Sequence, residues 1–167
     1  MTIDDTADNA SHSYLALDAE AVQKNHRNLQ VILANTLYMY QLYKKYHWHV
    51  TGKDFYQYHL LFDKHAEEQP VLVDLIAERM RTLGINVSAM PMDVSADTTL
   101  SEKEEVGHDP QAMVRNLLVA HEEYIKILRE AIKITDETGD AGTNDLLVSD
   151  ILRVHELQTW FIRSSLT

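Results

Sequence analysis

Apolar residues recur at three- and four-residue steps through most of the chain, which is the period of an α-helix with one buried face. The first such stretch runs from about Ala19 to Val50, after Asp18 as a capping residue. The second runs from about Asp54 to Leu83 and contains Pro70, where we expect a kink rather than a break. A helix of about 30 residues would be about 45 Å long.

The second half of the chain shows the same period after a long connection over residues 84–109. Within this connection an acidic stretch, 101–105, predicts a short helix of its own. A third long helix is expected over about 110–138 and a fourth over about 143–164. The pattern therefore predicts an all-α fold: a ferritin-like four-helix bundle with a short extra helix in the long crossover between the second and third helices.

Composition agrees with a single domain. Residues 1–17 carry few large apolar side chains and predict a flexible N-terminal tail, followed by one bundle domain over 18–167. The absence of cysteine excludes disulfides, thiolate zinc sites and cysteine nucleophiles. No apolar run approaches the roughly 18 residues of a membrane span, and no signal-like start is present, so we expect a cytoplasmic protein without a membrane partner.

Four side chains of metal-ligand type share one face of the second expected helix. At about 100° per residue, His59, Asp74 and Glu78 all lie within roughly 60° of Asp63. Imidazole and carboxylate groups together bind iron, zinc or manganese, and carboxylates favour the harder ions. The alternative is a solvated polar face, which is the commoner meaning of such a stripe.

The length of this helix limits how a site could form. At a rise of about 1.5 Å per residue, Asp63 and Asp74 are roughly 16 Å apart, and His59 and Glu78 about 28 Å. No single ion reaches both ends. Either the chain carries two unrelated half-sites, or a two-fold partner brings its Asp74 and Glu78 to His47, His59 and Asp63 of the first chain.

The segment 46–84 closely resembles the Dps family, the mini-ferritins known as DNA-binding proteins from starved cells. The shared signature is a His-Trp near the end of the first helix, a Gly-containing turn, His and Asp four residues apart, and then Asp and Glu four residues apart. With the bundle layout and Trp160-Phe161 in the last helix, the resemblance covers about residues 20–166. It matches five residues to the family's ferroxidase ligands: His47, His59, Asp63, Asp74 and Glu78.

The resemblance implies an enzyme, a ferroxidase that oxidises Fe(II), preferably with hydrogen peroxide, at di-iron sites shared by two subunits. It also implies a shell of twelve subunits that stores ferric mineral and protects against oxidative stress. Zinc is expected to compete with iron for the same ligands. Two alternatives are a metal buffer without redox turnover and a structural protein that compacts the nucleoid.

Several other residues are weaker candidates. His155 in the last helix is a candidate for a further metal ligand. His49 and His65 each lie about 200° from a neighbouring ligand, so we expect them to point elsewhere, His65 to solvent or to the interior surface of the shell. Trp48 beside a ligand either quenches radicals or fills the dimer interface.

Acidic residues also surround the turn before the fourth helix: Asp136, Asp140 and Asp145. The resemblance implies that this turn lines an acidic three-fold pore, where converging carboxylates would draw Fe(II) inward. The alternative is an ordinary solvated turn.

The charge of the chain bears on DNA binding. The net charge of −11 repels phosphate, and the tail contains Asp4, Asp5 and Asp8 but no Lys or Arg before Lys24. Family members that bind DNA often use Lys- and Arg-rich tails. Direct DNA binding is therefore not expected, and association with the nucleoid is kept as the alternative to a free cytoplasmic location.

Overall fold

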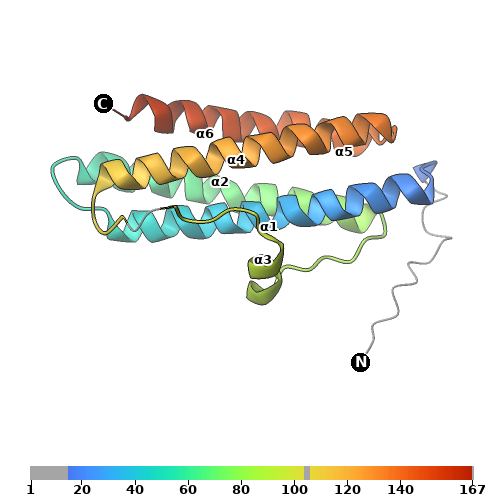
Figure 1. Cartoon of the computed structure of the whole chain (residues 1–167), viewed down its shortest axis with the longest axis horizontal. Helices are drawn as coiled ribbons and strands as arrows, with labels where there is room; N and C mark the ends of the chain where they lie inside the picture. Colours follow the sequence, from blue (N-terminus) through green and yellow to red (C-terminus); the bar gives the residue numbers. More distant parts are fainter. Residues whose placement is uncertain (1–14, 104–105, 167) are drawn as a thin grey trace.

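A computed structural model describes residues 15–103 and 106–166 of the chain. The elements in order are α1 Ala19–His49, α2 Phe55–Thr82, α3 Pro91–Asp97, α4 Pro110–Glu137, α5 Ala141–Asp145, a π-helical segment Leu146–Leu152 and α6 Arg153–Ser164. Figure 1 shows α1, α2, α4 and the run from α5 to α6 as four rods packed side by side. The described residues form no strand, so the predicted all-α bundle is confirmed.

The helix starts follow from local chemistry. The Asp18 carboxylate accepts a hydrogen bond of 2.8 Å from the Ala21 backbone N–H, which starts α1 as predicted. Asp109 caps α4 in the same way, with Pro110 at the first helical position. α2 continues through Pro70. None of the helices in the described ranges combines the length and apolarity needed to cross a membrane.

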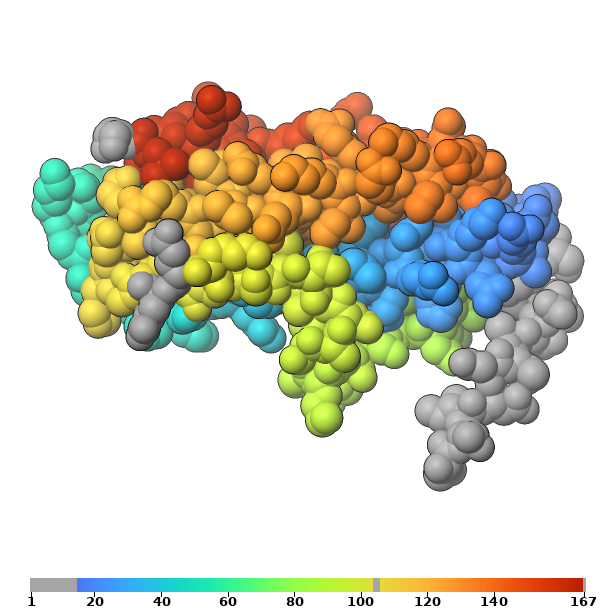
Figure 2. Space-filling model, in the orientation of Figure 1, coloured from blue at the N-terminus to red at the C-terminus, as the bar shows by residue number. Residues whose placement is uncertain are grey.

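The short helix of the crossover lies ten residues earlier than predicted. It is α3, where Pro91 occupies the first turn and the Met90 N–H donates to the Asp93 carboxylate at 3.0 Å. Residues 101–103 form no helix, and 104–105 lie outside the described residues. Glu102 from this stretch instead accepts hydrogen bonds from side chains of α1. Figure 2 shows that α3 protrudes from the side of the helical bundle.

The last long helix also differs from the prediction, because a π-helical segment over 146–152 separates α5 from α6. At the other end, residues 1–14 of the expected tail lie outside the described residues. Leu15 and Leu17 are half-buried and pack against the core, so the chain joins the bundle before α1 begins.

The middle of the core contains a layer of buried polar rings. His65 of α2, His121 of α4 and His155 of α6 are each 0% exposed. His65 and His121 contact Tyr43 of α1, and His155 contacts His121. The Tyr43 hydroxyl hydrogen-bonds to His121 Nε2 and, at 3.1 Å, to His65 Nδ1. Nδ1 of His121 lies 3.3 Å from Nδ1 of His155. We call these four residues the Tyr-His layer.

The position of His65 corrects the expectation that it faces solvent or the shell interior. On α2 it shares the buried face with Phe62, Leu72 and Ile76, which pack into the core. Burial in this layer lowers the pKa of His65 to about 4 and that of His155 to about 3. Burial also holds the pKa of His121 well below its usual range, so all three imidazoles are neutral in the folded chain.

We predict that the Tyr-His layer makes the protein sensitive to acid. Its three imidazoles bind protons below about pH 6.5 when unfolded but not when folded, so the stability they contribute above that pH is lost as the pH falls towards 4. The free energy of unfolding should fall by up to about 4 kcal/mol per pH unit, about 1.4 for each imidazole.

Urea denaturation between pH 6.5 and 5 measures this slope. His155→Leu should reduce the slope by the contribution of one imidazole, about 1.4 kcal/mol per pH unit. Replacement of the exposed His26 by Leu is the control and should leave the slope unchanged. An unaltered slope in His155→Leu would contradict the prediction.

Candidate metal centre

The end of α1 and the start of α2 bring His47 and His59 ring to ring. Their ring centroids are 3.7 Å apart, with 23° between the planes. The Nδ1–H of His47 donates to the His59 carbonyl at 2.9 Å, and the Nδ1–H of His59 donates to the His47 carbonyl at 2.9 Å. A turn containing Gly52, with a φ of 100°, reverses the chain between the two helices.

This reciprocal pair of hydrogen bonds determines the tautomer of both rings. A carbonyl oxygen can only accept, so each Nδ1 must carry the hydrogen, and each Nε2 of the neutral ring keeps its lone pair. Histidines that bind metals almost always hold their second nitrogen in this way. The donor set therefore fits a metal ion without a change of tautomer.

Asp63 lies beside this pair and is charged. Its Oδ1 is 2.7 Å from Nζ of Lys44 and 3.7 Å from Nδ1 of His47. The hydrogen bond from Lys44 lowers the pKa of the Asp63 carboxyl, and the nearby imidazoles act in the same direction. The Lys44 ammonium thus occupies one side of the carboxylate to which a metal cation would bind. Sequence reasoning missed Lys44, although it lies one turn before His47.

Asp74 and Glu78 lie far along α2 from these residues, and both are exposed. Since α2 is one continuous helix, its rise places Glu78 about 28 Å from His59. Within residues 15–103 and 106–166, no group of three or more His, Asp or Glu side chains is arranged to hold a metal. We call His47, His59 and Asp63 the first half-site, and Asp74 and Glu78 the second.

The weaker candidates lie elsewhere. His155 is fully buried and its ring contacts those of His121 and Tyr124, so its environment is the bundle core. His49 is exposed, and its Nδ1–H donates to the Lys45 carbonyl at 2.7 Å. Trp48 is 69% exposed.

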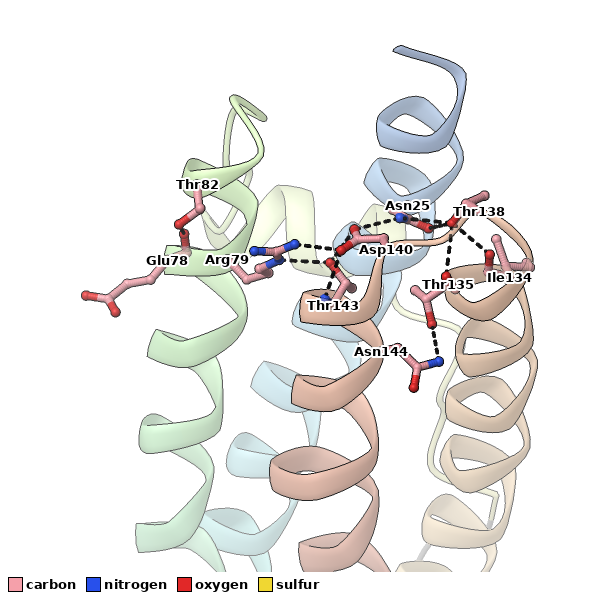
Figure 3. A network of polar contacts seen from close by, with 10 residues as sticks. All are labelled: Asn25, Glu78, Arg79, Thr82, Ile134, Thr135, Thr138, Asp140, Thr143 and Asn144. Atoms are coloured by element: carbon pink, nitrogen blue, oxygen red, sulfur yellow. Dashed lines mark hydrogen bonds and ion pairs between the residues drawn. The ribbon is translucent and has the colours of Figure 1, made fainter. Parts of the chain in front are cut away.

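The three acidic residues around the last turn have different environments. Asp136 and Asp145 are exposed, whereas Asp140 is 1% exposed. Its carboxylate accepts hydrogen bonds from Arg79 at 2.6 Å and from Asn25 at 2.8 Å, and also binds Thr143 (Figure 3). The expected pore role is therefore wrong for Asp140.

Asp140 does not line a pore because its carboxylate hydrogen-bonds to Arg79 of α2 and to Asn25 of α1. Burial alone would raise its pKa, but hydrogen bonds from Thr143 and the charge of Arg79 lower it, so the carboxylate stays ionised. Glu78, next to Arg79 in sequence, points away from this network on the outer side of α2 (Figure 3). The network thus fixes the end of α2 that carries the second half-site and leaves Glu78 outside it.

Comparisons with known proteins place the chain among ferritin-like proteins. The family model described as a ferritin-like domain matches residues 27–167. DpsC from Streptomyces coelicolor is similar, with 42% identity, a TM-score of 0.87, and coverage of 92% of this chain and 89% of that one.

Two further relatives are similar over most of their length. Dps from Vibrio cholerae O1, described as a member of a broad superfamily of ferritin-like diiron-carboxylate proteins, has 26% identity, a TM-score of 0.84, and coverage of 90% of this chain and 94% of that one. DNA protection during starvation protein 1 of Deinococcus radiodurans is 30% identical over 141 residues, which are 84% of this chain and 68% of that protein.

We predict that Lys44→Met strengthens metal binding at the first half-site. The change removes a positive charge that competes with a cation for Asp63. One charge near a protein surface changes such an interaction by about 1–4 kcal/mol. The affinity for Zn²⁺ should therefore rise about five- to tenfold, which corresponds to the lower end of that range.

Isothermal titration measures this affinity. Lys24→Met is the matched control, because Lys24 pairs with Glu20 and does not contact Asp63. Weaker Zn²⁺ binding by Lys44→Met would instead mean that Lys44 holds Asp63 in its binding position.

Proposed function

Because this chain belongs to the Dps family of ferritin-like proteins, we propose that it oxidises Fe(II) at sites shared between two subunits and stores the ferric product. The observation that carries the proposal is the separation of two incomplete half-sites along one rigid helix. A two-fold partner whose second half-site meets the first half-site of this chain would complete two sites by one contact. Each site would then have two imidazoles and three carboxylates.

The residues suit Fe(II) as a substrate. The two imidazoles present lone pairs at fixed tautomers, while three carboxylates favour the higher charge of Fe(III). Hydrogen peroxide is the proposed oxidant, since two iron ions side by side supply the two electrons that convert one peroxide to water. A single electron would release a hydroxyl radical, so paired oxidation protects the cell against oxidative stress.

The proposed assembly is a shell of twelve subunits in the cytoplasm. The net charge of −11 attracts iron cations, and the exposed Asp136 and Asp145 are the proposed lining of a three-fold entry pore. Zinc would compete for the same imidazoles and carboxylates. The similar Dps from Vibrio cholerae O1 supports this assignment, because it is described as a member of a superfamily of ferritin-like diiron-carboxylate proteins.

A complementation experiment tests whether the site is shared. His59→Ala and Asp74→Ala subunits should each form shells with little Fe(II) oxidation. In a shell co-expressed from both, every mixed dimer has one site with both half-sites intact and one with both damaged. Random mixing should therefore restore about a quarter of the wild-type rate, measured by the absorbance of ferric iron after peroxide addition.

The outcomes separate the alternatives. A site within one chain would give no restoration in the mixed shell, because each chain carries one damaged half-site. Full Fe(II) oxidation by each variant alone would show that His59 and Asp74 take no part in the reaction. A metal buffer without redox turnover would bind Fe(II) in the wild type but form no ferric core after peroxide.

We further propose that the chain does not bind DNA directly, although relatives are named for DNA protection. Its charge of −11 and the tail without Lys or Arg before Lys24 repel phosphate. A gel-shift experiment in low salt without divalent ions should show no retarded DNA. A shift that weakens steeply with added salt would reveal a basic surface formed by the assembled shell.

A further inference from the structure

A second pair of histidines lies where the crossover returns to the end of α1. His49 is the last residue of α1, and His108 lies just before α4, which starts at the same end of the bundle (Figure 1). Gly107, with a φ of 54°, makes the local turn before His108. The two rings are 6.0 Å apart between centroids, with 28° between their planes, and both side chains are exposed.

Backbone carbonyls hold both rings in one tautomer. The Nδ1–H of His49 donates to the Lys45 carbonyl at 2.7 Å, and the Nδ1–H of His108 donates to the His49 carbonyl at 2.7 Å. Each Nε2 of the neutral ring therefore keeps a lone pair. This is the arrangement that the first half-site shows and that metal-binding histidines generally have.

The separation of the rings is compatible with a shared ion. A metal about 2.1 Å from Nε2 lies roughly 3.2 Å from the ring centroid, so two imidazoles on one ion have centroids at most about 6.4 Å apart. The observed 6.0 Å falls within this limit. Glu102, whose carboxylate interacts electrostatically with His49, adds negative charge near the pair.

We propose that His49 and His108 form a second metal site, which binds a borderline divalent transition ion such as Ni²⁺, Cu²⁺ or Zn²⁺ through two imidazoles and water. Such ions prefer imidazole nitrogen, whereas harder ions need more carboxylate than this pair offers. The site is separate from the iron centre, because His49 lies about 200° around α1 from His47. A bound ion fastens the end of the crossover to the end of α1.

Nickel binding to the full-length protein tests the proposal. Equilibrium dialysis should show one Ni²⁺ fewer per chain in the double variant H49Q/H108Q than in the wild type, since glutamine keeps an amide donor but offers no imidazole lone pair. Either single change should weaken this binding at least about tenfold, because the loss of a direct ligand costs no less than the loss of an outer-shell partner, which costs about 10–100-fold. His26→Gln, at an exposed histidine of α1, is the matched control and should bind as the wild type does.

The same comparison in a His59→Gln and Asp63→Asn background removes the first half-site. The difference of one Ni²⁺ per chain should persist there, which separates this site from the proposed iron centre. In this background, nickel should raise the melting temperature when His49 and His108 are present but not when both are replaced by glutamine, and the two versions should melt alike without metal. Equal Ni²⁺ counts in the wild type and a folded H49Q/H108Q would overturn the proposal.

Discussion

The rigidity of α2 is the constraint on which the rest of the structure depends. Its 28 residues run without interruption through Pro70, so the residues along its outer face cannot be folded towards one another. Buried contacts on its opposite face, from Phe62 to Met80, hold it in the bundle, and the Arg79–Asp140 ion pair fixes its far end. A ligand set divided between the two ends of such a rod can meet only across a contact between chains.

Hydrogen bonds distinguish two groups of histidines within the described residues. In the His47–His59 and His49–His108 pairs, Nδ1–H donates to a backbone carbonyl, which leaves the lone pair of Nε2 free. In the Tyr-His layer, Nδ1 of each ring contacts another side chain of the layer, while Nε2 of His65 and Nε2 of His155 are buried without a hydrogen-bond partner among the described residues. Nδ1 therefore has a backbone partner in the first group and a side-chain partner in the second.

The sequence predicted the long helices well because apolar periodicity and capping residues are local signals. The π-helical segment at 146–152 was missed, since a small change in backbone pitch leaves the apolar pattern almost intact. The position of α3 was missed because the prediction followed the acidic stretch 101–105 rather than Pro91, a residue favoured in the first turn of a helix. His65 was placed by its angle from Asp63, although its angle to Phe62 and Ile76 indicates the core. The burial of Asp140 could not be predicted, because it depends on Arg79, which is 61 residues away.

The five candidate ligands could be found from sequence because their spacing is a property of one helix, but their meeting point is a property of two chains. Under the proposed function, the division of the ligands between two chains makes iron oxidation depend on assembly. A free subunit holds the first half-site with Lys44 against Asp63, and lacks the carboxylates of a second chain. Iron oxidation would then begin only where subunits have assembled, so that ferric product forms at the wall of the shell that stores it.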